Sequence, residues 1–256
     1  MTIFARYNFK GEIAFGIVAD TVIKEISQCP LLDYTETGIV HDLEDVRLLS
    51  PVTPSKIIAI GLNYKSHLDG RESPKAPEPF LKAPNTVIGL NDNIIIPKVA
   101  LNEKVKIQPE AELALVIGKE CKGVTAENAL EYVFAYTCGN DVSARDWQWN
   151  DLQWTRGKSS DTFAPIGPWM VTDLDPTNIQ VKCRVNGIEK QNQNTSDLIY
   201  PVTKIIEYVS AVMTLHPGDV IMTGTPGTPG DIHPGDIVEI EVEGVGVLSN
   251  PVIGES

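Results

Sequence analysis

The chain has 256 residues and carries 21 Lys and Arg against 34 Asp and Glu, which gives a formal net charge of −13 at pH 7. Hydrophobic residues make up 42% and charged residues 21%, an ordinary globular composition that excludes an intrinsically disordered chain. The acidic balance argues against nucleic acid and against an anionic membrane as partners, because both require a basic face.

The cysteines indicate a reducing compartment. They are widely spaced and form no CxxC pair, at Cys29, Cys121, Cys138 and Cys183. This spacing argues against a disulfide framework and against a structural zinc site. The sequence shows no secretory signal pattern at its start and no apolar run near the ~18 residues of a membrane span. We therefore expect a cytoplasmic protein with no membrane partner.

The first fifty residues predict short β-strands. Runs rich in Ile, Val, Phe and Thr, separated by Gly or Asp, predict these strands at 2–9, 13–18 and 21–26. An acidic stretch follows, and then two prolines close together, Pro51 and Pro54, mark a joint. We expect a small N-terminal β domain over residues 1–52 and a catalytic domain over residues 53–256.

The second part of the chain is also predicted to be rich in strands. Apolar runs predict them at 56–60, 105–107, 111–118, 133–139, 166–172 and 179–185. Apolar residues at helical spacing predict a helix over 201–215, and a capping residue followed by Glu127 predicts another over 125–133. The many Pro and Gly residues of segment 70–85 predict a long surface loop of the type used as a lid.

Glu110 and Glu112 stand at the start of the strand predicted at 111–118. Side chains at positions i and i+2 of a strand share a face, so both carboxylates project together. Asp141 follows the strand predicted at 133–139, and a connection of this length allows the two strands to lie side by side. Three carboxylates suit Mg²⁺ or Mn²⁺ rather than zinc. The alternative is that the two glutamates line a solvated strand edge.

Polar side chains after Asp141 are candidates for substrate binding. If a helical turn follows, Arg145 and Gln148 face the same way as Asp141 and could hold a substrate carboxylate, although a surface Asp–Arg pair explains them equally well. Lys158, one helical turn before Thr162, could neutralise a developing oxyanion or could be a solvated cation.

Two further positions could take part in chemistry. Thr225 belongs to a Gly- and Thr-rich turn after an apolar strand, where hydroxyl and N–H groups could bind an anion. His67 precedes the Pro-rich segment and could be a general base, with a structural role as the alternative. We expect the neighbouring aromatic residues to pack in the core or at a subunit interface rather than on a ligand: Trp147, Trp149 and Trp154.

Taken together, five segments resemble the fumarylacetoacetate hydrolase family. They are GLNYKSH (61–67), PEAELALVIGK (109–119), GNDVSARDWQ (139–148), GKSSDTFAPIGP (157–168) and MTGTPG (222–227). The resemblance implies an α+β, β-rich fold, a mixed β-sandwich roll that is usually a homodimer.

The resemblance also assigns roles to the candidate residues. It implies that Mg²⁺ or Mn²⁺ is bound by Glu110, Glu112 and Asp141. It places against a small carboxylate substrate the side chains of Arg145, Gln148, Lys158, Thr162 and Thr225. It makes His67 the acid/base, with Lys158 adding positive charge where an anion forms.

The family acts mostly on 2-oxo acids or their enols through a metal-stabilised enolate. Its hydrolases commonly carry a Glu one helical turn after the His, but that position here is Gly70; Glu72, five residues from His67, would have to curl back to orient the imidazole. We expect hydrolysis of a C–C bond in an acylpyruvate or fumarylpyruvate. The alternatives are an isomerase of the 2-hydroxyhepta-2,4-diene-1,7-dioate type, an oxaloacetate-type decarboxylase and, last, a non-catalytic metal-binding protein.

Overall fold

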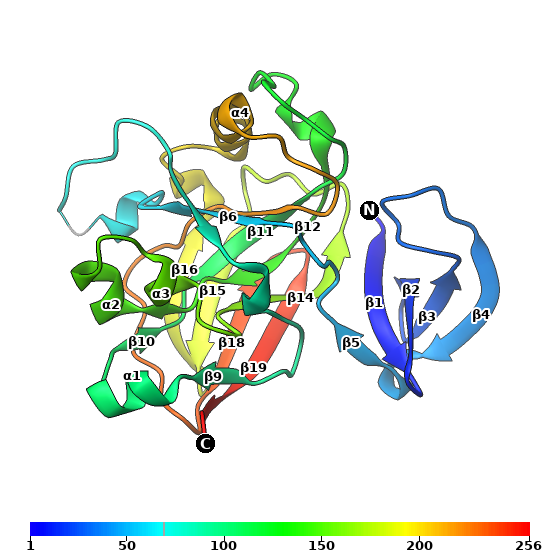
Figure 1. Ribbon diagram of the computed structural model, residues 1–256. Helices are drawn as coiled ribbons and strands as arrows, with labels where there is room; N and C mark the ends of the chain where they lie inside the picture. Colours follow the sequence, from blue (N-terminus) through cyan, green and yellow to red (C-terminus); the bar gives the residue numbers. More distant parts are fainter. Residues whose placement is uncertain (69) are drawn as a thin grey trace.

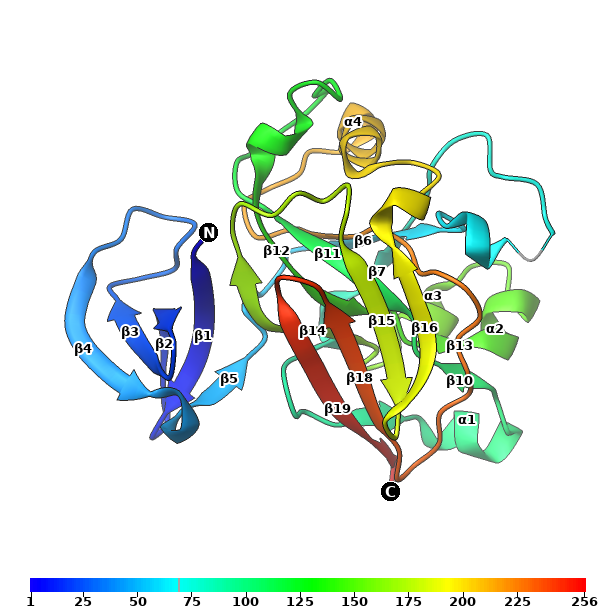
Figure 2. The same cartoon turned by 180° about the vertical axis from the view of Figure 1, so that it is seen from behind.

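A computed structural model describes residues 1–68 and 70–256. Two large β-sheets form the body, a group of N-terminal strands lies at one side, and short helices lie at the opposite side and at the top of the view (Figure 1, Figure 2). Parallel and antiparallel pairs both occur. The expected α+β, β-rich class with a mixed β-sandwich roll is therefore confirmed.

The N-terminal group consists of β1 (Ile3–Phe9), β2 (Glu12–Ala19), β3 (Val22–Ile26), β4 (Glu36–Asp42) and β5 (Arg47–Leu49). The three strands predicted here are present, with ends shifted by one residue at most. β4, which crosses the acidic stretch, and β5 were not predicted. The group has a small core of its own and joins the body where β1 pairs with β14 at Ile3 and Phe4.

The first sheet of the body continues from β1 in the order β14-β12-β11-β17-β6-β7. These strands are β14 (Ala164–Val171), β12 (Val133–Asn140), β11 (Ala111–Ile117), β17 (Val220–Met222), β6 (Ile57–Gly61) and β7 (Glu78–Lys82). The second sheet has the order β16-β15-β18-β19-β9. Its strands are β16 (Ile188–Asn194), β15 (Gln180–Val185), β18 (Ile237–Val242), β19 (Gly246–Gly254) and β9 (Ile94–Ile96).

Strand β11 is the central strand for the site, and all seven of its residues are buried. Leu113, Leu115 and Ile117 contribute to the largest core cluster, which includes residues of the second sheet, whereas Ala114 and Val116 belong to a separate cluster. This alternation is the period-two pattern of a strand whose two faces are both covered.

The remaining elements are short. The helices are α1 (Lys98–Glu103), α2 (Arg145–Asn150), α3 (Thr155–Lys158) and α4 (Val202–Val212). The 3₁₀ turns are η1 (Leu43–Asp45), η2 (Lys65–His67), η3 (Pro84–Thr86), η4 (Ala129–Tyr132) and η5 (Thr195–Asp197). Two-residue strands are β8 (Val87–Ile88), β10 (Ile107–Gln108) and β13 (Ser143–Ala144).

Helix α4 confirms the helix predicted over 201–215, although it is shorter at both ends. Its buried side chains include Val202, Ile205, Ile206 and Val209, which lie on one helical face. The helix predicted over 125–133 is wrong. That segment forms turns and the single 3₁₀ turn η4, because it is too short to bury an apolar stripe of its own.

The segment 70–85 is not a continuous loop. Residues 78–82 form β7, which pairs with β6 and places Pro79 opposite Ile60. In the described order β7 is the last strand of the first sheet, a position that tolerates proline because one side of an edge strand needs no N–H donor.

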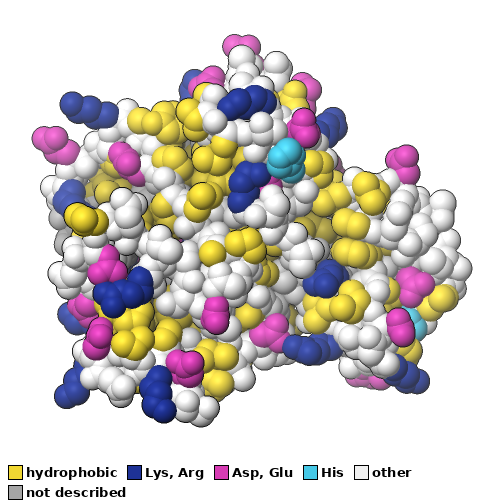
Figure 3. All heavy atoms as spheres, viewed as in Figure 1, with side chains coloured by type: hydrophobic (Ala, Val, Ile, Leu, Met, Phe, Trp, Pro, Cys, Tyr) yellow, Lys and Arg dark blue, Asp and Glu magenta, His cyan; other side chains and the backbone are white. Residues whose placement is uncertain are grey.

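The charged side chains on the face shown in Figure 3 are mixed, with Lys and Arg interspersed among Asp and Glu. Hydrophobic side chains gather on this face where the N-terminal strands meet the body. None of the helices within residues 1–68 and 70–256 is long and apolar enough to cross a membrane.

Candidate active site

Three buried carboxylates meet where β11 begins and β12 ends. β11 and β12 are antiparallel neighbours, and the backbone N–H of Asp141 donates to the carbonyl of Glu110 at 3.0 Å. Oxygen atoms of Glu110, Glu112 and Asp141 lie within 4.8 Å of one another, and the three residues are only 5%, 1% and 1% exposed. The structure therefore brings the predicted cluster together in the interior, and the alternative of a solvated strand edge is excluded.

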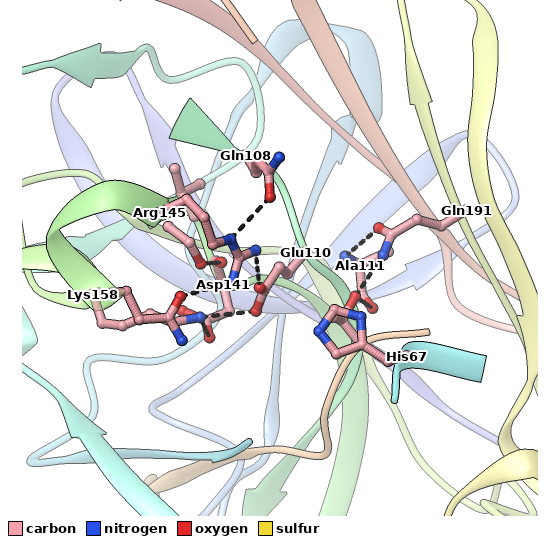
Figure 4. A network of polar contacts seen from close by, with 12 residues as sticks. His67, Gln108, Glu110, Ala111, Asp141, Arg145, Lys158 and Gln191 are labelled. Atoms are coloured by element: carbon pink, nitrogen blue, oxygen red, sulfur yellow. Dashed lines mark hydrogen bonds and ion pairs between the residues drawn. The ribbon is translucent and has the colours of Figure 1, made fainter. Parts of the chain in front are cut away.

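The cluster is balanced by cations from two helices (Figure 4). Lys158 Nζ, at the end of α3, lies 2.8 Å from Glu110 Oε2 and 2.6 Å from Asp141 Oδ2. Arg145, the first residue of α2, places Nη2 2.5 Å from Glu110 Oε1. Burial alone would raise the pKa of Glu110, but Lys158 and Arg145 hold it below its ordinary value.

Glu112 is the carboxylate that lacks a cationic partner at close range among the described residues. Burial, followed by the negative charges of Asp141 and Glu110, raises its pKa well above the ordinary value. Its Oε2 accepts one backbone hydrogen bond, 2.5 Å long, from Gly224 N. A carboxylate under this repulsion is stabilised by any further positive charge at the cluster.

Lys82 is a site residue that the sequence did not suggest. Its Nζ lies 2.6 Å from Asp141 Oδ1, and it also donates to the carbonyls of Val142 and Lys158. The side chain comes from edge strand β7 and is fully buried. Lys82 thus ties the edge strand to the cluster and to the backbone of the helix that carries Lys158.

Arg145 and Gln148 lie together, as predicted. Arg145 Nη1 donates to Gln148 Oε1 at 2.6 Å, and Nε donates to Gln108 Oε1 at 2.9 Å. The helix begins at Arg145 and not at Asp141, so the two residues do not share a helical face. Arg145 instead directly follows β13, which pairs with β10, and this pairing positions Arg145 at the cluster.

Thr225 is fixed at the edge of the cavity by two strands. Its hydroxyl donates to the carbonyl of Ala111 at 2.9 Å and accepts from Gln191 Nε2 at 2.8 Å. Gln191 also accepts from the backbone N–H of Ala111 at 3.0 Å. Gln191 and Gln108 were not predicted, because an isolated glutamine in a strand carries no sequence signal of a site.

His67 faces the same cavity from η2 (Figure 4). Its Nδ1 is hydrogen-bonded to the carbonyl of Gly227. A carbonyl can only accept, so this contact places the ring proton on Nδ1 and leaves the lone pair on Nε2. The backbone of Gly227 therefore fixes the tautomer of an imidazole that can accept a proton.

Two predicted residues lie away from this constellation. Thr162 Oγ1 accepts from the backbone N–H of Ile95 at 2.8 Å, and Thr162 is not among the residues that line the cavity. The family resemblance placed Thr162 against the substrate; the helical turn expected between Lys158 and Thr162 is not formed, because α3 ends at Lys158. Glu72 is exposed, does not line the cavity and forms no hydrogen bond with His67 in the described part of the chain.

Aromatic rings form part of the wall of the cavity. Trp154 packs edge-on against Phe80 with ring centroids 5.0 Å apart, and Trp149 is 59% exposed beside the opening. Of the three tryptophans expected to pack in the core or at a subunit interface, Trp147 lies in the core, at 4% exposed. The cavity is thus acidic and cationic at its base and aromatic on its wall.

The donor set fits a hard divalent cation. Glu110, Glu112 and Asp141 offer carboxylate oxygens in a cluster small enough to share one ion, with no sulfur or imidazole among them. The repulsion on Glu112 supports the same fit, because a bound cation would offset it.

Comparison with known proteins finds matches over nearly the whole chain. The family pattern "Fumarylacetoacetate (FAA) hydrolase C-terminal" matches residues 56–253, and the pattern "Rv2993c-like, N-terminal" matches residues 4–51. A mitochondrial oxaloacetate tautomerase, fahd2 of Xenopus laevis, is 42% identical over 82% of this chain and 69% of its own length.

Two solved structures share the whole fold. A 5-carboxymethyl-2-hydroxymuconate delta-isomerase from Mycobacterium smegmatis is 45% identical, with a TM-score of 0.92 and full coverage of both chains. A maleylpyruvate hydrolase from Sphingobium sp. SYK-6, in complex with manganese(II) and pyruvate, is 30% identical, with a TM-score of 0.82 and full coverage of both chains.

Proposed function

Since the chain belongs to the fumarylacetoacetate hydrolase family, we propose that it is a Mg²⁺- or Mn²⁺-dependent enzyme that moves a proton between the keto and enol forms of a small 2-oxo acid. This proposal places isomerase or tautomerase chemistry ahead of the C–C bond hydrolysis expected from the sequence. The observation that carries it is the buried carboxylate cluster with Lys158 at its edge and His67 facing the same cavity.

The metal has a defined place in this proposal. Glu110, Glu112 and Asp141 would hold it, and when bound it supplies a Lewis acid for the oxygens of a 2-oxo acid. Arg145 and Gln148 line the cavity beside the cluster and present donors to the substrate carboxylate. Thr225 lies on the same wall, with its hydroxyl held by Ala111 and Gln191.

The proton transfer is assigned to His67 and Lys158. The lone pair on His67 Nε2 accepts the proton that leaves C3 of the keto acid. Lys158 adds positive charge where the 2-oxo oxygen becomes negative, and neighbouring carboxylates keep it protonated because Asp141 and Glu110 raise its pKa against the effect of burial. Transfer of this proton from His67 Nε2 to the 2-oxo oxygen completes the enol and restores the neutral imidazole, and no bond between heavy atoms breaks.

The names of two relatives support tautomerase or isomerase chemistry ahead of hydrolysis. The tautomerase and the isomerase are more than 40% identical to the chain, and both names describe rearrangement without cleavage. In addition, Glu72 is exposed, so His67 is oriented by a neutral carbonyl and not by a carboxylate that would strengthen it for attack by water.

Hydrolysis remains the second candidate because the maleylpyruvate hydrolase shares the fold and carries manganese with pyruvate. The test is a nuclear magnetic resonance assay of the Mg²⁺-loaded enzyme with oxaloacetate and with fumarylpyruvate. Keto–enol interconversion faster than in buffer, without new products, supports the proposal. Pyruvate and fumarate formed from fumarylpyruvate at an enzymatic rate, without accelerated interconversion, would assign hydrolysis instead.

A further inference from the structure

Arg71 is a cation of the cavity that the proposed mechanism does not use. Its side chain lines the cavity together with Glu110, Asp141, Arg145 and Lys158. Arg145 and Lys158 are both paired with carboxylates of the cluster. Arg71, in contrast, forms no ion pair with a carboxylate within residues 1–68 and 70–256.

Backbone contacts and an aromatic ring hold the Arg71 guanidinium in place. Nε donates to the carbonyl of Leu68 at 2.9 Å, and Nη2 donates to the carbonyl of His67 at 3.3 Å. The guanidinium carbon lies 5.6 Å from the ring centroid of Trp149. A guanidinium has five N–H groups, so three are left for a ligand. The head group is therefore oriented while part of its donor set stays free.

Burial defines where Arg71 lies along the cavity. Glu110, Asp141 and Lys158 are 5%, 1% and 2% exposed, whereas Arg71 is exposed and Trp149 is 59% exposed. The cluster thus forms the closed end of the cavity, and Arg71 stands at the end that faces solvent. A substrate whose 2-oxo acid group reaches the cluster extends its remaining carbons toward Arg71.

We propose that Arg71 binds the second carboxylate of a 2-oxo dicarboxylic acid and so selects dicarboxylates over monocarboxylates. The inference rests on the proposed function, because it takes the cluster as the site of the 2-oxo acid group. A free guanidinium presents paired N–H donors that match the two oxygens of a carboxylate. In a protein of net charge −13, such a cation also offsets the repulsion of a dianion at the cavity mouth.

Two unreactive ligands isolate this contact. N-oxalylglycine and N-methyloxamate share the oxalyl amide that imitates a 2-oxo acid, and they differ in that only N-oxalylglycine has a second carboxylate. Isothermal titration calorimetry of the Mg²⁺-loaded protein should show that N-oxalylglycine binds about tenfold more tightly, a ratio equivalent to about 1.4 kcal/mol. Arg71→Gln should abolish this ratio and leave the affinity for N-methyloxamate unchanged, which also shows that the variant is folded.

Lys75→Gln is the matched control, because Lys75 is an exposed cation of the same segment that does not line the cavity. It should keep the tenfold ratio. A ratio that persists in Arg71→Gln, or a wild type that does not distinguish the two ligands, overturns the role of Arg71 and leaves the proposed function standing. Failure of both ligands to bind the Mg²⁺-loaded wild type overturns the 2-oxo acid site and the Arg71 inference together.

Discussion

Lys82 Nζ lies 2.6 Å from Asp141 Oδ1, and neither side chain is more than 1% exposed. This ion pair joins the edge strand β7 to the end of β12, across the base of the cavity. Burial lowers the pKa of Lys82, and the negative charge of Asp141 opposes that effect. Lys82 therefore holds Asp141 in place within the carboxylate cluster, and the negative charge of Asp141 favours the protonated form of Lys82.

Replacing Lys82 tests this relationship. Lys82→Met keeps an unbranched side chain of nearly the same length but removes one partner of a buried ion pair, which we expect to lower the free energy of unfolding by about 3 kcal/mol. Urea denaturation followed by fluorescence measures the change. Lys75→Met, at an exposed position, should change it by less than about 0.5 kcal/mol. Equal stability of the two variants would show that the Lys82–Asp141 pair has no structural role.

Glu112 tests whether a residue that destabilises the metal-free fold is needed to bind the metal. Glu112→Gln removes one of three adjacent negative charges and can still accept the hydrogen bond from Gly224. In chelator-treated protein at pH 7 we expect the free energy of unfolding to rise, because the pKa of Glu112 is raised in the folded state and its ionisation therefore opposes folding. Calorimetric titration with Mn²⁺ should show at least a tenfold loss of affinity, of the order of 1.4 kcal/mol. Unchanged Mn²⁺ affinity would refute Glu112 as a ligand.

His67 is expected to affect turnover without affecting the metal. His67→Gln removes the proton acceptor, so kcat for keto–enol interconversion should fall about 100-fold. Its Mn²⁺ affinity should stay within about twofold of wild type, a difference below 0.5 kcal/mol. Loss of both properties would mean that His67 has been assigned the wrong role. Glu72→Gln, measured alongside, should leave kcat unchanged if Glu72 stays exposed during turnover.

Position 224 requires glycine, because of its backbone conformation and because of the atoms close to it. Its φ is +104°, and a Cβ there would lie 2.8 Å from Asn63 Cβ and 3.1 Å from the carbonyl oxygen of Ile60. Gly224→Ala should therefore destabilise the fold by about 2 kcal/mol more than Gly235→Ala. Gly235 is the matched control, since its φ is +99° and nothing lies within 4 Å of its Cβ position. Equal losses of stability in Gly224→Ala and Gly235→Ala would show that the contacts with Asn63 and Ile60 cost nothing and that only the positive φ matters.

Local pattern brought the three carboxylates together but left a solvated strand edge as the alternative, and only the family resemblance assigned them to a metal. Glu110 and Glu112 share a face because strands have a period of two, and Asp141 joins them because β11 and β12 are neighbours. Residue composition predicted three of the five N-terminal strands to within one residue, and helical spacing predicted the apolar stripe of α4. These features depend on residues that are close in sequence or on adjacent strands.

Features that depend on distant segments were missed. Lys82 lies in a segment whose prolines suggest a loop, and only its pairing with β6 as an edge strand makes it part of the interior. Gln191 reaches Thr225 from the other sheet, across 34 residues of sequence. The helical spacing between Lys158 and Thr162 is not realised, because Thr162 has a positive φ of 68° and lies in a turn.

Solvent deuterium exchange at C3 of oxaloacetate tests the central claim most directly. In D₂O with Mg²⁺, the wild-type protein should speed exchange well beyond the rate in buffer, chelation should abolish the acceleration, and added Mg²⁺ should restore it. Glu112→Gln should show no acceleration under the same conditions. Acceleration that survives chelation, or Mg²⁺-dependent turnover that releases cleavage products with no exchange at C3, would contradict the account.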